Sequence, residues 1–147
     1  MSTNRITLGC FEVVSLPEFG LEHVVAKVDT GAFSGAIHCT DMKVVRRGVR
    51  RKRYLTFVPA GKLELTQETD KFIKRHVRSA TGHRRKRYLV QTTIEIKGKT
   101  YPIEIGLSDR SDMKRQVLLG RRFLREQNML VDVGLNVEFD DEGELLK

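Results

Sequence analysis

The stretch that decides the fold lies in the first quarter of the chain and ends beside a carboxylate. Residues 24–32 read Val24-Val25-Ala26-Lys27-Val28-Asp29-Thr30-Gly31-Ala32. Its apolar part is typical of a buried β-strand, and Asp, Thr and Gly are common turn residues. Because a lone Asp-Thr-Gly occurs often by chance, this stretch alone predicts only a strand that ends in a turn.

A second stretch, near the C-terminus, gives this motif a partner. It reads Val117-Leu118-Leu119-Gly120-Arg121-Arg122-Phe123-Leu124. We expect a short apolar strand that leads through Gly-Arg into a helix over residues 121–127. In this order and at this separation, the two stretches resemble the retropepsins, the single-lobe aspartic proteases typified by the retroviral enzymes. The resemblance implies that the apolar-apolar-Gly strand packs across the Asp-Thr-Gly loop.

Further motifs narrow the resemblance and extend it over most of the chain. They are Ala36-Ile37-His38, Arg110-Ser111-Asp112-Met113, Leu118-Leu119-Gly120-Arg121 and Leu130-Val131-Asp132. Together they look like the bacterial and archaeal RimB-like family of retropepsin-like proteins, long labelled an ATP-dependent zinc protease. The resemblance assigns catalysis to Asp29. It implies an active-site loop and a supporting strand and helix made of Thr30, Gly31, Ala32, Leu118, Leu119, Gly120 and Arg121.

Zinc and ATP find no support in the sequence itself. There is neither a His-Glu-x-x-His zinc motif nor a Gly-x-x-x-x-Gly-Lys-Ser/Thr phosphate loop. His38, Cys39 and Asp41 carry metal-ligating atoms, but three close polar residues without a matching distant pair are usually structural. We expect no metal and no cofactor, so activity should survive chelators and should not depend on ATP.

An aspartic protease needs two carboxylates that share one proton, one to activate water and one to protonate the substrate carbonyl. The chain has one Asp-Thr-Gly, so we expect a homodimer with the active site on its two-fold axis. Gly31 should let the two loops approach without a Cβ clash. Asp132 is the internal alternative, but the few residues after it cannot build a second lobe, and we interpret it as a strand end.

The sequence departs from the retroviral pattern at one position beside the loop. In retroviral enzymes an Asp follows Asp-Thr-Gly-Ala and pairs with the arginine of Gly-Arg. Phe33 stands at that position here, so the pairing does not carry over. Three outcomes stay open for Arg121, which can contact Asp112, Asp41 or neither.

Positive charge is concentrated in two runs. The chain has 27 Lys and Arg against 19 Asp and Glu, a formal net charge of +8. Arg-Arg-Lys-Arg-Tyr-Leu occurs at residues 50–55 and again at 84–89, and each copy leads into a β-prone run, so we expect two strands with the same basic edge. Retropepsins place their flaps in this part of the chain. The residues that we expect to bind an acidic peptide are Arg50, Arg51, Arg53, Arg84, Arg85 and Arg87.

The resemblance sharpens this expectation about the substrate. Relatives of the family are often linked to ATP-grasp ligases that add glutamates to a ribosomal protein tail. This link implies a polyglutamylated protein as substrate and a ribosomal protein as a partner. Two other classes stay open: a catalytically silent basic module that binds RNA, a ribosome or an acidic protein, and a hydrolase that uses Cys39. The last is disfavoured because Cys39 and its neighbour His38 point to opposite faces of a strand.

The whole chain reads as one mostly β domain, residues 1–147. Its length suits a single core, and no apolar run reaches the roughly 18 residues that a membrane span needs. We expect a closed retropepsin-like barrel with one short C-terminal helix, no membrane partner and a cytoplasmic location. Residues 66–74 could form a second helix or an ordered loop. Strands are expected at 5–14, 22–28, 36–44, 54–58, 72–78, 88–96, 100–107, 117–119 and 129–133.

Overall fold

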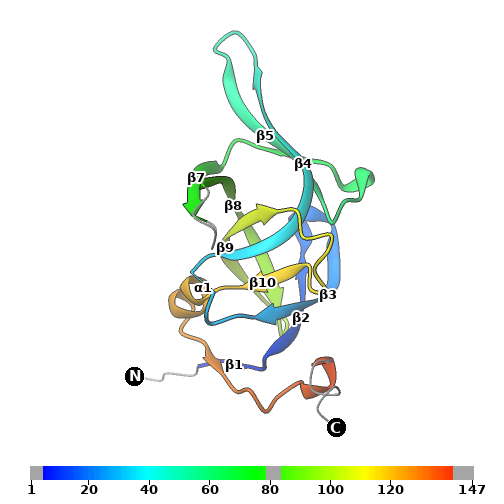
Figure 1. Cartoon of the computed structure of the whole chain (residues 1–147), viewed down its shortest axis with the longest axis vertical. Coiled ribbons are helices and arrows are strands. Elements are labelled where there is room, and N and C mark those ends of the chain that lie inside the picture. Colours follow the sequence, from blue (N-terminus) through cyan, green and yellow to red (C-terminus); the bar gives the residue numbers. More distant parts are fainter. Residues whose placement is uncertain (1–4, 79–83, 141–147) are drawn as a thin grey trace.

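Strands make up most of the protein (Figure 1). A computed structural model describes residues 5–78 and 84–140, with side chains described outside residues 77–86. The strands are β1 (Thr7–Leu8), β2 (Phe11–Leu16), β3 (Leu21–Val28), β4 (Gly35–Arg47), β5 (Lys52–Pro59), β6 (Gln67–Thr69), β7 (Phe72–Arg78), β8 (Arg84–Ile96), β9 (Lys99–Ser108), β10 (Val117–Leu119) and β11 (Leu130–Val131). The helical elements of the described chain are α1 (Arg121–Glu126) and the 3-10 turns η1 (Pro17–Phe19), η2 (Leu63–Leu65) and η3 (Val137–Phe139).

Six strands close into a barrel. Their order is β10, β3, β2, β8, β9 and β4, and β10 also pairs with β4, which joins the two ends of the sheet. At this seam Leu118 of β10 lies opposite Lys27 of the parallel β3 and Ala36 of the antiparallel β4. The closed single-lobe barrel with one short helix is therefore confirmed.

The barrel interior is filled by apolar side chains from alternate strand positions. Ile94 and Ile96 of β8 and Ile103, Ile105 and Leu107 of β9 are all buried, because successive side chains of a strand point to opposite faces. Burial of each such side chain contributes about 1.5–3 kcal/mol. This core gives the loops at the barrel ends a rigid base.

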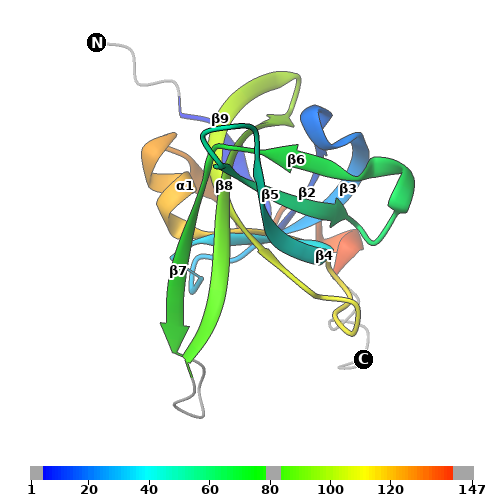
Figure 2. The ribbon, with the colours of Figure 1, turned by 90° about the horizontal axis from the view of Figure 1, so that it is seen from above.

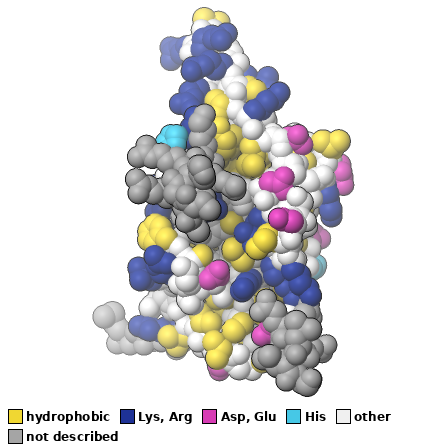
Figure 3. All heavy atoms as spheres, in the orientation of Figure 1, with side chains coloured by type: hydrophobic (Ala, Val, Ile, Leu, Met, Phe, Trp, Pro, Cys, Tyr) yellow, Lys and Arg dark blue, Asp and Glu magenta, His cyan; other side chains and the backbone are white. Residues whose placement is uncertain are grey.

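Two hairpins project from the barrel. Beyond the barrel, β4 stays paired with β5 as far as Arg47 and Lys52, and this hairpin rises from one end of the molecule (Figure 1). The hairpin of β7 and β8 extends in another direction (Figure 2). Because β5 begins at Lys52 and β8 at Arg84, the expected basic edges of two strands are confirmed. Lys and Arg side chains gather on the β4–β5 hairpin (Figure 3).

The structure corrects two local predictions. Residues 66–74 form neither a helix nor a loop: β6 and the start of β7 lie there, and Glu68 pairs with Thr56 of β5. The single strand expected over residues 5–14 is broken into β1 and β2, because the amide of Gly9 turns to bond the Glu12 carboxylate at 2.7 Å. In the described part of the chain, no helix is both long and apolar enough to cross a bilayer.

Candidate active site

The Asp-Thr-Gly loop follows directly from the end of β3. The amide of Asp29 donates to the carbonyl of Leu119 at 2.9 Å, which ties the loop to β10. One oxygen of the Asp29 carboxylate accepts the amides of Gly31 at 3.0 Å and Ala32 at 2.8 Å. The carboxylate is thus oriented by its own loop, while Thr30 is exposed.

The strand β10 and the helix α1 brace this loop through backbone hydrogen bonds. The first amides of the helix, those of Arg121 and Arg122, donate to the carbonyls of Ala32 at 2.8 Å and Phe33 at 3.1 Å. A Cβ on Gly120 would lie 2.7 Å from the Ser34 carbonyl carbon. Glycine is therefore required where the second motif crosses the loop.

Within one chain, Gly31 has open surroundings. A Cβ placed there would meet only the Oδ1 atom of Asp29, at 3.4 Å. The tight crossing inside the protomer falls instead at Gly35 and Gly120, where the nearest atoms are backbone. Whether Gly31 faces a second subunit stays a prediction.

Arg121 contacts neither of the carboxylates that we considered. Its Nη1 donates to the carbonyl of Gly31 at 3.1 Å, and its guanidinium lies 5.5 Å from the centre of the Phe33 ring. Phe33 occupies the position of the retroviral aspartate, so a cation–π contact stands where the ion pair would be. Arg122 also faces this ring, at 6.0 Å.

A cleft of about 710 Å³ opens beside Asp29. Three members of the Arg110–Met113 motif, namely Arg110, Asp112 and Met113, line it with Asp29. The structure therefore brings two motifs together that are far apart in the sequence. The fourth member, Ser111, donates its hydroxyl to Asp109 at 2.5 Å, and this bond lowers the pKa of the Asp109 carboxyl.

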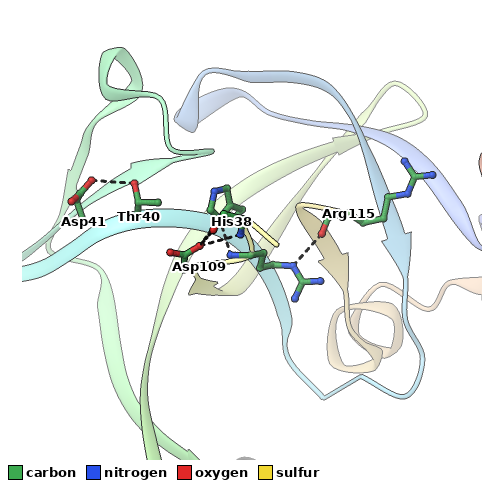
Figure 4. Close-up of polar contacts among 7 residues, drawn as sticks. His38, Thr40, Asp41, Asp109 and Arg115 are labelled. Atoms are coloured by element: carbon green, nitrogen blue, oxygen red, sulfur yellow. Dashed lines mark hydrogen bonds and ion pairs between the residues drawn. The ribbon is translucent and has the colours of Figure 1, made fainter. Parts of the chain in front are cut away.

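A buried histidine holds the loop that carries this motif (Figure 4). The backbone amide of Arg110 donates to Nδ1 of His38 at 2.8 Å, and Asp109 lies 3.8 Å from the same nitrogen. An Nδ1 atom that accepts a hydrogen bond is unprotonated, so neutral His38 carries its proton on Nε2. Sequence reasoning weighed His38 only as a metal ligand or a base and missed this positioning contact.

The other two residues considered as metal ligands, Cys39 and Asp41, are a buried thiol and a carboxylate that is hydrogen-bonded to its neighbour. Burial raises the pKa of the Cys39 thiol to about 12, and Asp41 accepts a hydrogen bond from the Thr40 hydroxyl at 3.1 Å. In the ranges 5–78 and 84–140, no three His, Cys, Asp or Glu side chains are grouped so that they could hold a metal ion.

None of the basic-run arginines whose side chains are described is among the residues that line the cleft, although Arg87 of the second run lies near Arg110. Arg50, Arg51 and Arg53 are exposed at or near the tip of the β4–β5 hairpin, and the side chains of Arg84 and Arg85 lie outside the described residues. Their role in binding substrate stays a prediction. The cations that line the cleft are Lys27, Arg110, Lys114 and Arg115. In the sequence, these four cations are marked by their position in or next to the Asp-Thr-Gly and Arg-Ser-Asp-Met motifs, and not by a high local density of charge.

Cys39 should resist alkylation in the folded protein. With a pKa of about 12, only about one molecule in 10⁴ carries the thiolate near pH 8. We expect iodoacetamide to label the partly exposed Cys10 first, as read by peptide mass spectrometry, and to label Cys39 only after denaturation. Equal labelling of the two thiols in native protein would contradict this and reopen a role for Cys39 as a nucleophile.

A closed six-strand barrel whose single Asp-Thr-Gly loop is braced by an apolar-apolar-Gly strand and a short helix defines a single-lobe aspartic protease fold. The chain belongs to the family described as "Retropepsin-like aspartic endopeptidase RimB", which it matches over residues 7–140. A solved structure from Legionella pneumophila, described as a protein with unknown function, is 26% identical with a TM-score of 0.64, covering 88% of this chain and 95% of that one.

Curated relatives carry a different name. The chain is 27% identical over 148 residues to a "Probable alpha-L-glutamate ligase" of Shewanella pealeana, covering 99% of this chain and 32% of that protein. A protein of the same name from Parasynechococcus marenigrum is 29% identical over 122 residues, covering 81% and 26%. The chain therefore spans about a third or less of the length of these relatives.

Proposed function

We propose that this protein is a cytoplasmic aspartic peptidase that acts as a homodimer on glutamate-rich protein tails, among them the tail of a ribosomal protein. The observation that carries the proposal is the oriented Asp29 carboxylate at the edge of a cleft with four cationic side chains. Membership of a retropepsin-like endopeptidase family supports the peptidase class. The ligase name of the relatives supports glutamate as the residue recognised.

The proposed mechanism pairs Asp29 with Asp29 of the partner subunit. At a separation of ~3 Å and an effective dielectric of ~20, two negative charges repel by roughly 5 kcal/mol, so the pair retains one proton. The ionised carboxylate takes a proton from water as the water oxygen attacks the peptide carbonyl, and the protonated one donates to the carbonyl oxygen. Transfer of a proton to the amide nitrogen then allows the C–N bond to break.

Salt should weaken the preference for acidic peptides. Charge pairs open to solvent lose strength as the Debye length falls from about 10 Å at 0.1 M salt to about 3 Å at 1 M. We expect a labelled oligoglutamate peptide to be cut faster than its glutamine counterpart at low salt, with a ratio of kcat/KM that shrinks steeply at 1 M. Mass spectrometry of the products measures both rates. A salt-independent preference for apolar peptides would contradict the proposed substrate.

The second candidate function is a basic binding module without catalysis. It is favoured by the exposed Arg46, Arg50, Arg51 and Arg53 on a hairpin that projects from the barrel. A polyanion such as RNA can neutralise such a run of charges. Tighter binding to RNA than to oligoglutamate, with cleavage of neither, would support this function over the peptidase.

A further inference from the structure

Arg110 is a half-buried arginine that the fold holds in place beside Asp29. Its backbone amide donates to the buried His38, and its Nε donates to the carbonyl of Arg115 at 3.1 Å (Figure 4). The first bond ties the loop after β9 to β4, the second lies within that loop, and the side chain lines the same cleft as Asp29. A guanidinium that is oriented before a ligand arrives loses less conformational freedom on binding.

The charge of Arg110 is incompletely balanced. Among the described residues, no carboxylate lies within ion-pair distance of its guanidinium, and its terminal nitrogens, unlike Nε, have no hydrogen-bond partner. Burial lowers the pKa of Arg110, and the nearby positive charge of Arg87 lowers it further. The negative charges of Asp112 and Asp29 raise this pKa, but by less. Even so lowered, an arginine remains charged near neutral pH. An incoming anion would therefore be stabilised here.

Arg87 approaches from the barrel wall. It lies on β8 next to the pairing of Leu89 with Gly106 of β9. A Cβ on Gly106 would come 3.0 Å from Cδ of Arg87, so the missing side chain leaves room for the arginine stem to cross the sheet. Arg87 of β8 is thus near Arg110 of the loop after β9, although it is not itself among the residues that line the cleft.

We propose that Arg110, assisted by Arg87, forms a carboxylate-binding subsite next to Asp29 that selects an acidic residue close to the scissile bond. A planar guanidinium matches a carboxylate in two parallel hydrogen bonds, which an amide cannot reproduce. The inference rests on the proposed peptidase function and adds the recognition residue to it. The carboxylate has two possible sources, the side chain of a glutamate or the free C-terminus of the tail.

The test compares Arg110→Gln with the unaltered protein on four peptides: glutamate or glutamine beside the cleaved bond, each with a free or amidated C-terminus. Loss of a charge-assisted hydrogen bond predicts a fall of about tenfold or more in kcat/KM for the preferred peptide. The glutamine peptide should change by no more than about twofold, since it lacks the charge. Sensitivity to amidation instead of to glutamine would assign the subsite to the terminal carboxylate.

Two further variants separate recognition from folding. Arg125→Gln removes an exposed arginine of α1 outside the cleft and should leave the discrimination unchanged. Arg110→Lys keeps the charge but not the planar fork, and should restore part of the preference. Equal losses of kcat/KM on all four peptides by Arg110→Gln, with an unchanged thermal midpoint, would overturn the proposed subsite.

Binding distinguishes failure of the subsite from failure of the proposed function. In an Asp29→Asn background the glutamate peptide stays intact, and fluorescence anisotropy measures its Kd directly. We expect Arg110→Gln to weaken that Kd by about tenfold or more. This result would uphold the subsite even if the unaltered protein cleaved no peptide, whereas an unchanged Kd would overturn it whatever the catalytic activity.

Discussion

Asp29→Asn should lower peptide hydrolysis by about 10³-fold or more, because an amide can act neither as the base that activates water nor as the acid that protonates the carbonyl. The fold should persist, since the Oδ1 atom of asparagine can still accept the amides of Gly31 and Ala32. Steady-state kinetics on an oligoglutamate peptide gives the loss, and sedimentation equilibrium shows whether the variant remains a dimer.

Asp132→Asn is the matched control for this variant. Asp132 follows β11 and accepts the amide of Gly134 at 2.9 Å, and it is not among the residues that line the cleft. Its substitution should change kcat/KM by no more than a few-fold. Hydrolysis that survives in the Asp29→Asn protein, or a monomer that is fully active at tens of micromolar, would refute the shared pair of carboxylates.

Gly120→Ala should destabilise the protein by about 3 kcal/mol or more. The added Cβ would lie 2.7 Å from the carbonyl carbon of Ser34, 2.8 Å from the amide nitrogen of Gly35 and 2.9 Å from the carbonyl oxygen of Ala32. All three are backbone atoms, so no side chain can rotate away to relieve the clash. For a chain of this size the thermal midpoint should fall by roughly 10 °C, as measured by calorimetry or circular dichroism.

Gly31→Ala provides the comparison. The added Cβ would touch only a carboxylate oxygen of Asp29 at an ordinary contact distance of 3.4 Å. Within the protomer this substitution should therefore cost much less stability than Gly120→Ala. If the order of the two thermal midpoints were reversed, the close crossing would lie at the Asp-Thr-Gly loop itself.

Much of the fold could be predicted from the sequence because its signals are local. Period-two apolar runs and the Lys97-Gly98 turn, in which both residues have positive φ, mark β8 and β9 directly. Pro102 lies where β9 has β8 as its paired neighbour but has not yet met β4, as its missing amide requires. The segment at 66–74 was misjudged because its polar strand β6 depends on pairing with β5, a contact that local sequence does not encode.

The candidate site was predictable in part. Its motifs indicated Asp29 and the Arg110–Met113 loop, but only the closed barrel shows that both border one cleft. The His38 contact and the stacking of Arg121 on Phe33 depend on which face each residue presents after folding. The cations of the cleft lie outside the two dense basic runs, one at Lys27 and three within residues 110–115, so a search for dense runs of charge passes over them.

The parallel pairing of β1 with β11 has a consequence for chains that carry additional domains. Thr7 lies beside Leu130 and Leu8 beside Val131, and β1 is at the opposite end of the molecule from the β4–β5 hairpin (Figure 1). This two-stranded sheet holds the first and the last strand of the described chain together at one end of the molecule. A polypeptide fused upstream of β1 would therefore emerge near β11, at the opposite end of the molecule from the basic β4–β5 hairpin.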